Sequence, residues 1–178
     1  RSIDSGETWQ ARLLTDRALT TLALAVDSTE PGVVFAGTTE GVYGSTDSGQ
    51  NWKAAGHESL GVTVVALAAD ATGPQLLYAG TDDGNLWVSP DDGDSWTDLT
   101  PNLDGLVPDG TYVSRIEPSH HEAQRVYVTF DNHRRGDFTP YVLVSDDRGG
   151  SFRSISSNLP TGKPDFAHVI REDPVNEN

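Results

Sequence analysis

Short apolar runs alternate with clusters of Gly, Asp, Ser and Pro along most of the chain. Runs such as residues 62–70 (VTVVALAAD) and 125–130 (RVYVTF) are bounded by turn-forming residues and are rich in β-branched and aromatic side chains, which is typical of strands. No segment shows a convincing helical period of apolar residues. The pattern therefore predicts an all-β protein of short antiparallel strands.

The runs fall into units of four strands, which we label A to D in chain order. The strands expected are residues 20–27, 32–38, 41–47 and 51–56 in the first unit, 62–70, 75–81, 85–91 and 95–100 in the second, and 112–119, 125–130, 140–147 and 151–157 in the third. Residues 1–14 supply only strands C and D of a preceding unit, and residues 166–173 supply only strand A of a following one. The prediction is therefore fifteen strands, one short of four complete units.

One motif, which we call the box, recurs between strands C and D of every unit. It reads Ser-x-Asp-x-Gly-x, then Thr, Ser or Asn, then Trp or Phe. Its four copies are Ser2, Asp4, Gly6 and Trp9; Ser45, Asp47, Gly49 and Trp52; Ser89, Asp91, Gly93 and Trp96; and Ser145, Asp147, Gly149 and Phe152. The aspartates lie 43, 44 and 56 residues apart, and a period in the forties fits a four-stranded propeller blade.

The chemistry of the box indicates a structural turn. Asp and Ser side chains bond nearby backbone N–H groups, Gly supplies a positive φ, and the aromatic ring is expected to pack between neighbouring sheets. A metal loop is the alternative, but no copy has the alternating ligands and closing Glu of a calcium loop. With no cysteine in the chain, thiolate ligation is unavailable, and we expect no metal and no cofactor.

The four boxes resemble the Asp-box, or bacterial neuraminidase repeat, of sialidases, xyloglucan-degrading glycoside hydrolases, sortilin-type receptors and photosystem II assembly propellers. The third unit is most similar to secreted bacterial propellers with sortilin-like repeats. The resemblance implies a β-propeller of four-stranded antiparallel blades and a secreted, periplasmic or cell-surface location. It also implies that the box is a turn remote from any active site, and it leaves the function open because one fold serves many functions.

The repeat divides the chain into one propeller segment with an incomplete ring. Residues 1–16 are expected to form strands C and D of a blade, 17–58, 59–103 and 104–162 three full blades, and 163–178 strand A of a further blade. Because the sequence contains no methionine, we expect it to be a piece of a longer protein. Other segments of that protein, or further copies of this chain, are expected to complete the propeller.

The net charge of the chain limits the kinds of partner that it can bind. Twelve Lys and Arg stand against 27 Asp and Glu, a net charge of -15, which disfavours nucleic acids and anionic membrane surfaces. No apolar run approaches the length of a membrane span, so direct membrane insertion is not expected. A hydrophobic content of 35% still indicates a folded core.

Two insertions distinguish the third unit. About seven extra residues lie between strands B and C, in DNHRRGDFTPY (131–141), and about five precede strand A, in PNLDGLVPDG (101–110). Because B–C and D–A loops share one face of a propeller, both insertions are expected opposite the boxes, where binding residues collect on loops. The ligand-binding candidates in the B–C loop are His133, Arg134, Arg135, Asp137 and Tyr141; a solvated loop with internal charge pairs is the alternative.

A second set of candidates lies on strand A, which lines the axis of a propeller. Arg115, His168 and Arg171 are ligand-binding candidates there. Arg115 and Arg171 occupy similar places in successive units, and they form either an anion clamp or structural ion pairs with neighbouring carboxylates.

Three classes of function remain. A non-catalytic module that recognises a protein, peptide or glycan needs only a rigid propeller with a varied loop face. A glycoside hydrolase of the sialidase or xyloglucanase kind needs a pair of acids at a defined separation, and its candidates are Glu117, Asp131 and Asp137 with Tyr112 or Tyr141. No residue can be assigned a catalytic role from the sequence. The third class is an assembly or structural subunit of a larger complex.

Overall fold

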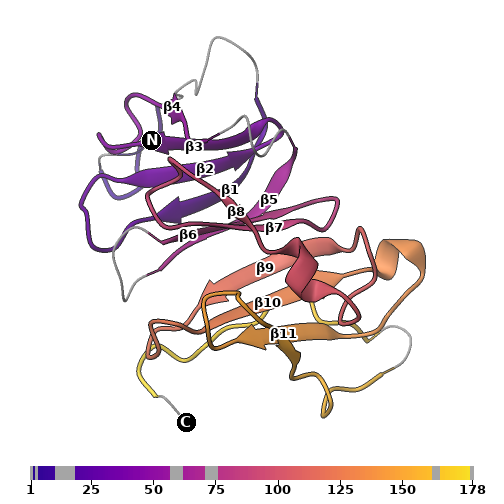
Figure 1. Ribbon diagram of the computed structural model, residues 1–178. Helices are drawn as coiled ribbons and strands as arrows, with labels where there is room; N and C mark the ends of the chain where they lie inside the picture. Colours follow the sequence, from indigo (N-terminus) through magenta and orange to yellow (C-terminus); the bar gives the residue numbers. More distant parts are fainter. Residues whose placement is uncertain are drawn as a thin grey trace.

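The computed structural model describes residues 2, 4–10, 19–56, 62–70, 76–161 and 165–176. Within these ranges the strands form three four-stranded antiparallel sheets, each with its strands in chain order (Figure 1). The strands are β1 (Thr21–Val26), β2 (Val34–Thr38), β3 (Gly41–Ser45) and β4 (Lys53–Ala54); β5 (Val64–Ala69), β6 (Leu77–Thr81), β7 (Leu86–Ser89) and β8 (Thr97–Asp98); and β9 (Tyr112–Pro118), β10 (Val126–Asp131), β11 (Tyr141–Ser145) and β12 (Arg153–Ser154). The predicted all-β architecture is confirmed.

Helical structure is limited to two short 3-10 turns in the described part of the chain. They are η1 (Thr100–Leu103), which follows β8, and η2 (His133–Arg135), which follows β10. Both lie in the segments where the sequence predicts insertions. No helix in the described ranges is long and apolar enough to cross a membrane.

Each box folds into the same hydrogen-bonded turn. In the second sheet, Ser89 Oγ donates to Asp91 Oδ1 at 2.9 Å and accepts from the Gly93 N–H at 2.7 Å. Asp91 then accepts from the backbone N–H and the side chain of Ser95. The equivalent bonds recur around Asp4, Asp47 and Asp147. The box is therefore a self-contained turn, because its serine and aspartate bond within it.

Two consecutive residues of every box have positive φ. The glycine was expected there, but the residue before it is also left-handed, with φ between 55° and 59° at Ser5, Ser48, Asp92 and Arg148. These are non-glycine residues in a region that L side chains seldom adopt. The bonds made by the box serine and aspartate on both sides hold this pair in place.

Boxes share one face of the molecule with the A–B turns. The Ser48 N–H donates to the Gly32 carbonyl, and the Arg148 N–H donates to the Gln124 carbonyl, both at 2.8 Å. On the other face the Asp82 N–H, in a B–C turn, donates to the Thr63 carbonyl before β5. The predicted division into a box face and a loop face is confirmed for these sheets.

We expect Asp91→Ala to destabilise the fold by about 1–2 kcal/mol, because the Ser89 hydroxyl and the Ser95 N–H lose their acceptor. Thermal unfolding measures the change. Asp94→Ala is the matched control, since Asp94 is an exposed neighbour in the same loop. Equal stability of the two variants would contradict a structural role for the box aspartate.

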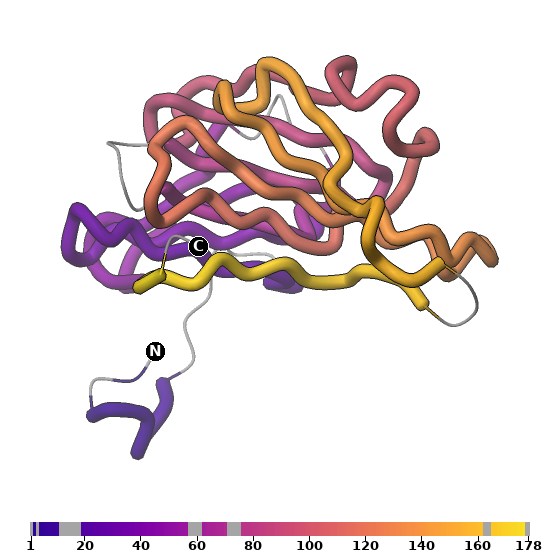
Figure 2. Tube along the Cα trace, turned by 90° about the horizontal axis from the view of Figure 1, so that it is seen from below, coloured from indigo at the N-terminus to yellow at the C-terminus, as the bar shows by residue number. Residues whose placement is uncertain are grey.

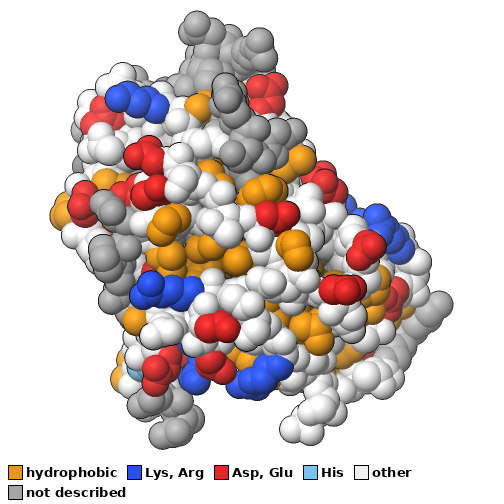
Figure 3. All heavy atoms as spheres, in the orientation of Figure 1, with side chains coloured by type: hydrophobic (Ala, Val, Ile, Leu, Met, Phe, Trp, Pro, Cys, Tyr) orange, Lys and Arg blue, Asp and Glu red, His pale blue; other side chains and the backbone are white. Residues whose placement is uncertain are grey.

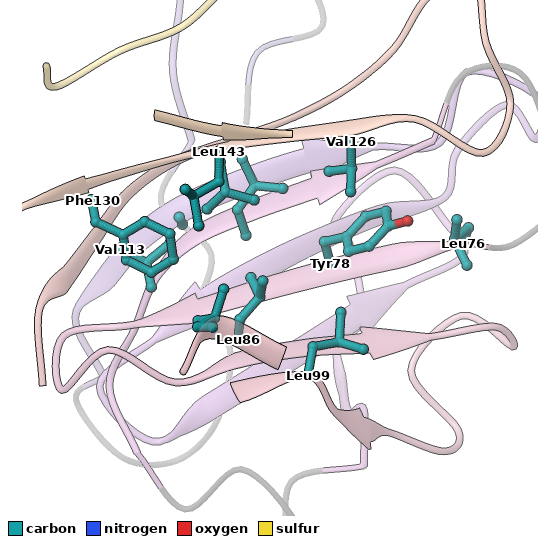
Figure 4. Packing of buried hydrophobic residues seen from close by; sticks show 12 residues of the cluster. Leu76, Tyr78, Leu86, Leu99, Val113, Val126, Phe130 and Leu143 are labelled. Carbon is teal, nitrogen blue, oxygen red and sulfur yellow. The ribbon is translucent and has the colours of Figure 1, made fainter. Parts of the chain in front are cut away.

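Neighbouring sheets pack through their inner strands. β5 lies against β1 and β2, and β9 lies against β5 and β6. Tyr78, Leu86, Val113, Val126 and Phe130 form the centre of the cluster between the second and third sheets, where each is at most 1% exposed (Figure 4). A similar cluster around Phe35, Val64 and Leu77 joins the first two sheets.

Two glycines allow this close approach. A Cβ built on Gly80 in β6 would lie 2.4 Å from Val113 Cγ1 in β9, and one on Gly37 in β2 would lie 2.8 Å from Val64 Cγ1 in β5. Neither distance is sterically possible. These glycines serve sheet packing, since neither has the positive φ that would otherwise require glycine.

Gly80→Ala should therefore destabilise the fold by about 1–3 kcal/mol through overpacking. Adding Val113→Ala should recover part of this loss, because it removes the atoms that the new methyl group meets. A double-mutant cycle on denaturant unfolding measures the coupling. Additive effects would show that this contact does not limit the sheet separation.

The stack of three sheets leaves an end open at β1. Leu22, Leu24 and Val26 are 45%, 65% and 64% exposed there. Leu24 matches Leu67 and Ile116 in the repeat, and both of those are buried against the preceding sheet. Hydrophobic side chains also gather between acidic ones on the face shown in Figure 3. An unsatisfied packing surface at β1 is what an incomplete ring leaves, as predicted.

The N-terminal box lies apart from the sheets. Figure 2 shows it away from the body of the molecule, and Trp9 is 74% exposed. This ring was expected to pack between sheets, and Trp96, whose Nε1 donates to the Ala55 carbonyl of the neighbouring unit, does so. Residues 4–10 form no strand, and 11–18, where the predicted strand D continues, lie outside the described residues. The assignment of residues 1–16 to a further blade stays a prediction.

The C-terminal segment, residues 165–176, runs along the third sheet as an extended chain (Figure 2). It contains only a single bridge residue, Asp165, and no strand. Its end repeats the A–B turn. Asp173 Oδ1 accepts from the Val175 and Asn176 N–H groups, as Asp27 accepts from Thr29 and Glu30, and as Ser119 Oγ accepts from His121 and Glu122. The shared turn supports the assignment of residues 163–178 to strand A of a further blade, which stays a prediction.

Candidate functional site on the loop face

The two insertions of the third unit meet on the loop face. Arg135 Nη1 donates to the Asp109 carbonyl at 3.0 Å, which joins the B–C loop after β10 to the D–A loop before β9. Beside it, the guanidinium of Arg134 lies 5.5 Å from the centre of the Tyr112 ring, within the range of a cation–π interaction. The expectation that both insertions share this face is confirmed.

A hollow of about 510 Å³ opens next to this junction. Its walls come from the B–C turn of the second sheet and the long D–A connection with η1, and Phe130 of β10 also borders it. Apolar lining comes from Leu103, Val107, Pro101 and Pro108, and carboxylates come from Asp83, Asp98, Asp104 and Asp109. Its volume is that of a small-ligand site, and its lining mixes apolar surface with hydrogen-bonding groups.

Asp137 fixes the shape of the B–C loop. Its carboxylate accepts from the Thr139 N–H at 3.0 Å, Asn132 Nδ2 at 3.0 Å and Tyr141 Oη at 2.8 Å. Burial raises the pKa of Asp137, but these hydrogen bonds outweigh it and lower the pKa to about 2. Arg135-Gly136-Asp137 is thus held in a folded turn, with Gly136 at φ 79° closing η2.

The third sheet differs from the first two on the side that faces the next unit. At the strand-A positions that pack on the next sheet, β1 has Ala23 and Ala25 and β5 has Ala66 and Ala68, whereas β9 has Arg115 and Glu117. On strand B, Thr129 stands where the earlier sheets have Gly37 and Gly80. The third sheet therefore packs on the C-terminal segment through polar groups.

Two arginines share Glu117. Arg115 Nη2 and Arg171 Nη1 donate to Glu117 Oε2 at 2.7 and 2.8 Å. Glu117 is 4% exposed, and its burial raises its pKa despite the opposing effect of Arg115. Of the two interpretations of these arginines, the geometry matches the structural ion pair. Counted from the turn residues Ser119 and Asp173, Arg171 matches Glu117 and not Arg115, which corrects the expected correspondence between the arginines.

Two histidines share Asp131 at the opposite end of β10. The ring Nδ1 atoms of His133, in the B–C loop, and of His168, in the C-terminal segment, both lie within hydrogen-bond distance of its carboxylate. The His133 ring also stacks on Phe166, with ring centres 4.6 Å apart. Burial raises the pKa of Asp131, but its hydrogen bonds from His133 and His168 give a net lowering.

Glu172 forms a third contact between the segment and the sheet. It accepts from Ser119 Oγ at 2.8 Å, from the His120 N–H and from Tyr127 Oη. Burial alone would raise its pKa, but these hydrogen bonds lower it. Carboxylates of the sheet, Glu117 and Asp131, and a carboxylate of the segment, Glu172, therefore join the C-terminal segment to β9 and β10.

The predicted site residues thus separate into two groups. His133, His168, Arg115 and Arg171 converge on two buried carboxylates, whereas Arg134, Arg135, Asp137 and Tyr141 shape the loop beside the hollow. Sequence reasoning missed Ser119 and Asp173 as turn residues, and it missed the hollow's aspartates. Aligning Asp27, Ser119 and Asp173 would have identified the turns. The hollow depends on how distant loops meet, for which the sequence carries no local signal.

The two buried acids among the catalytic candidates lie at different places along the third sheet. Glu117 pairs with Tyr127 across the β9–β10 ladder, and Asp131 lies four residues further along β10. At about 3.4 Å per residue this places their backbones roughly 13 Å apart. Each acid is also engaged by cationic or histidine side chains. Among the described residues, no group of three His, Asp or Glu could hold a metal ion.

No protein family matches the sequence, and no curated protein matches it. Solved structures do resemble it. An ancestral GH74 enzyme superposes with a TM-score of 0.63 at 20% identity over 86% of this chain, and the GH74 xyloglucanase from Xanthomonas campestris with 0.57 at 18% over 80%. YCF48 bound to D1 peptide superposes with a TM-score of 0.55 at 15% identity over 88% of this chain.

These similarities concern the fold. The chain spans 20% and 24% of the two GH74 enzymes and 47% of the YCF48 chain. The matched structures are propellers, so the all-β propeller fold of four-stranded blades, with an incomplete ring, is confirmed. At such identities nothing about activity follows from the superposition.

Asp131→Asn should lower the stability by about 1–3 kcal/mol at neutral pH, because an amide offers one acceptor oxygen to groups that now share two. Since folding lowers the pKa of Asp131, its contribution is present above the ordinary value of 3.8 and is lost as the pH falls further. The difference in the free energy of unfolding between wild type and variant should therefore become smaller in acid. Asp104→Asn, at an exposed position, is the control, and a gap that does not change with pH would contradict this role.

Proposed function

We propose that this chain is a non-catalytic propeller module that recognises a protein, a peptide or a glycan through the loop face opposite the boxes. The observation that carries the proposal is the hollow of about 510 Å³ beside the two insertions of the third unit. It lies on loops supported by buried sheets, where binding residues usually collect. The box face is occupied by repeated turns in which the side chains of the box serine and aspartate form their hydrogen bonds within the turn.

Electrostatics supports a cationic or hydroxyl-rich ligand. Four aspartates border the hollow, and the whole chain carries a net charge of -15. Such a potential attracts Lys- or Arg-bearing peptides and raises their association rate. Carboxylates also accept hydrogen bonds from sugar hydroxyl groups. Asp104 and Asp109 are exposed, so a ligand reaches them without unfolding any strand.

A glycoside hydrolase, of which this chain would be one part, is the second candidate. The carboxylates around the hollow favour it, as does the structural likeness to two GH74 enzymes. An assembly subunit that holds a peptide segment of a partner fits the same hollow. We place the recognition module first because Glu117 and Asp131 serve the attachment of the C-terminal segment. The family resemblance supports a secreted, periplasmic or cell-surface location.

A paired binding and activity screen tests the proposal. The whole chain is probed with cationic peptide and oligosaccharide arrays and with chromogenic glycosides. We expect binding without turnover, and Asp104→Asn with Asp109→Asn should weaken a cationic ligand about tenfold or more through loss of two charges at the hollow.

Asp94→Asn with Glu122→Gln is the matched control, because it removes the same two charges from the box face. Arg134→Ala with Arg135→Ala should also weaken binding, since Arg135 holds the rim of the hollow. Equal affinity of the loop-face and box-face variants would overturn the proposed location. Hydrolysis of a glycoside by the chain alone would favour the enzyme instead.

A further inference from the structure

The four carboxylates that border the hollow have no cationic partner in the described part of the chain. No described Lys, Arg or His lies within ion-pair distance of them, whereas two arginines meet the carboxylate of Glu117 and two meet that of Asp146. All four residues are exposed, and they are Asp83, Asp98, Asp104 and Asp109. A cationic ligand group can therefore neutralise this charge without breaking an ion pair.

Two guanidinium groups at the rim of the hollow also lack a carboxylate partner among the described residues. Arg135 donates to the Asp109 carbonyl and not to its carboxylate, and Arg134 lies over the Tyr112 ring. Arg135 also lies beside Gly110, where an added Cβ would be 3.1 Å from its Nη2. Because Asp109 and Gly110 both line the hollow, positive charge stands directly beside its acidic wall.

The apolar part of the lining matches the stem of a basic side chain. Leu103, Val107 and two prolines supply aliphatic surface beside the carboxylates. Lys and Arg bury their methylene stems on such surface while their charged heads reach polar groups. A sugar ring would find no open aromatic face to stack on in the described lining, because Phe130, its aromatic residue, is 1% exposed. The lining therefore favours a basic peptide over a glycan.

We propose that the hollow and its two rim arginines bind a peptide segment of a partner protein in which a basic and an acidic side chain lie close together. This inference rests on the proposed function, since it names the ligand class of that site. The Lys or Arg side chain of the peptide enters the hollow and meets Asp104 and Asp109. The acidic side chain stays at the rim and pairs with Arg134. Charges of opposite sign on the two sides fix the direction of the segment and disfavour peptides of a single sign.

A short series of capped peptides, in which glycines separate one Arg from one Glu, provides the probes. Fluorescence anisotropy measures their binding to the whole chain. Citrulline in place of the peptide's Arg keeps the side-chain shape without the charge and should lower the affinity about tenfold or more. Asp104→Asn with Asp109→Asn should weaken the Arg peptide more than the citrulline peptide. Equal losses for the two peptides would overturn the placement of the basic side chain.

A double-mutant cycle tests the rim. Gln in place of the peptide's Glu, and Arg134→Gln in the protein, should each lower the affinity about threefold, because water screens a partly exposed pair. Together they should lower it little further. Arg153→Gln removes the same charge from the exposed strand β12 and should leave the affinity unchanged. Additive effects in the cycle, or an equal loss with Arg153→Gln, would contradict the pairing at Arg134.

NMR chemical-shift changes locate the bound peptide, and we expect them at residues 102–111 and 133–135. If a neutral oligosaccharide or an uncharged peptide binds there and the Arg–Glu peptides do not, recognition at the loop face stands and this inference fails. If the Arg–Glu peptides shift only residues of the box face, both this inference and the proposed location are overturned.

Discussion

Close approach of neighbouring sheets at their inner strands is the constraint on which the rest of the structure depends. Gly37 and Gly80 leave room for Val64 and Val113, and pairs of alanines on β1 and β5 keep the strands near each other. The sheets can then bury their aromatic and aliphatic residues between them. The box turns close each sheet at its outer strand with bonds that need no neighbour, so loops on the opposite face are free to vary.

That constraint changes at the third sheet. Arg115, Glu117 and Thr129 replace the small residues, and the C-terminal segment is attached by ion pairs and hydrogen bonds. A junction with buried charges accepts fewer packing segments than one made of alanines, because a buried carboxylate is costly unless the segment supplies its partners. The C-terminal segment supplies Arg171, which pairs with Glu117, and His168, which bonds to Asp131. Both buried carboxylates of the sheet therefore have a partner on the segment.

The repeat made most of the fold predictable from sequence, because each box and each alternating run is a local signal. The first three strands of each sheet were predicted close to their observed bounds, whereas the fourth strand, predicted over six or seven residues, has only two in each sheet. The second left-handed residue, such as Ser48, was missed because no glycine marks it. The candidate site was predicted less well. His133, Arg135 and Asp137 were identified as members of the inserted B–C loop, but the contacts of Arg135 with Asp109 and of His168 with Asp131 join residues that are distant in the sequence. Trp9 was expected to be buried, yet its ring has no sheet to pack on.

Charge pairing between Glu117 and Arg171 holds the C-terminal segment on the third sheet. A double-mutant cycle of Glu117→Gln and Arg171→Gln, measured by amide hydrogen exchange of residues 167–173, tests this role. Because Arg171 is partly exposed, we predict a coupling of about 0.5–1 kcal/mol, with faster exchange in each single variant and little further increase in the double variant. Additive effects, or exchange in this segment that neither substitution changes, would contradict the account.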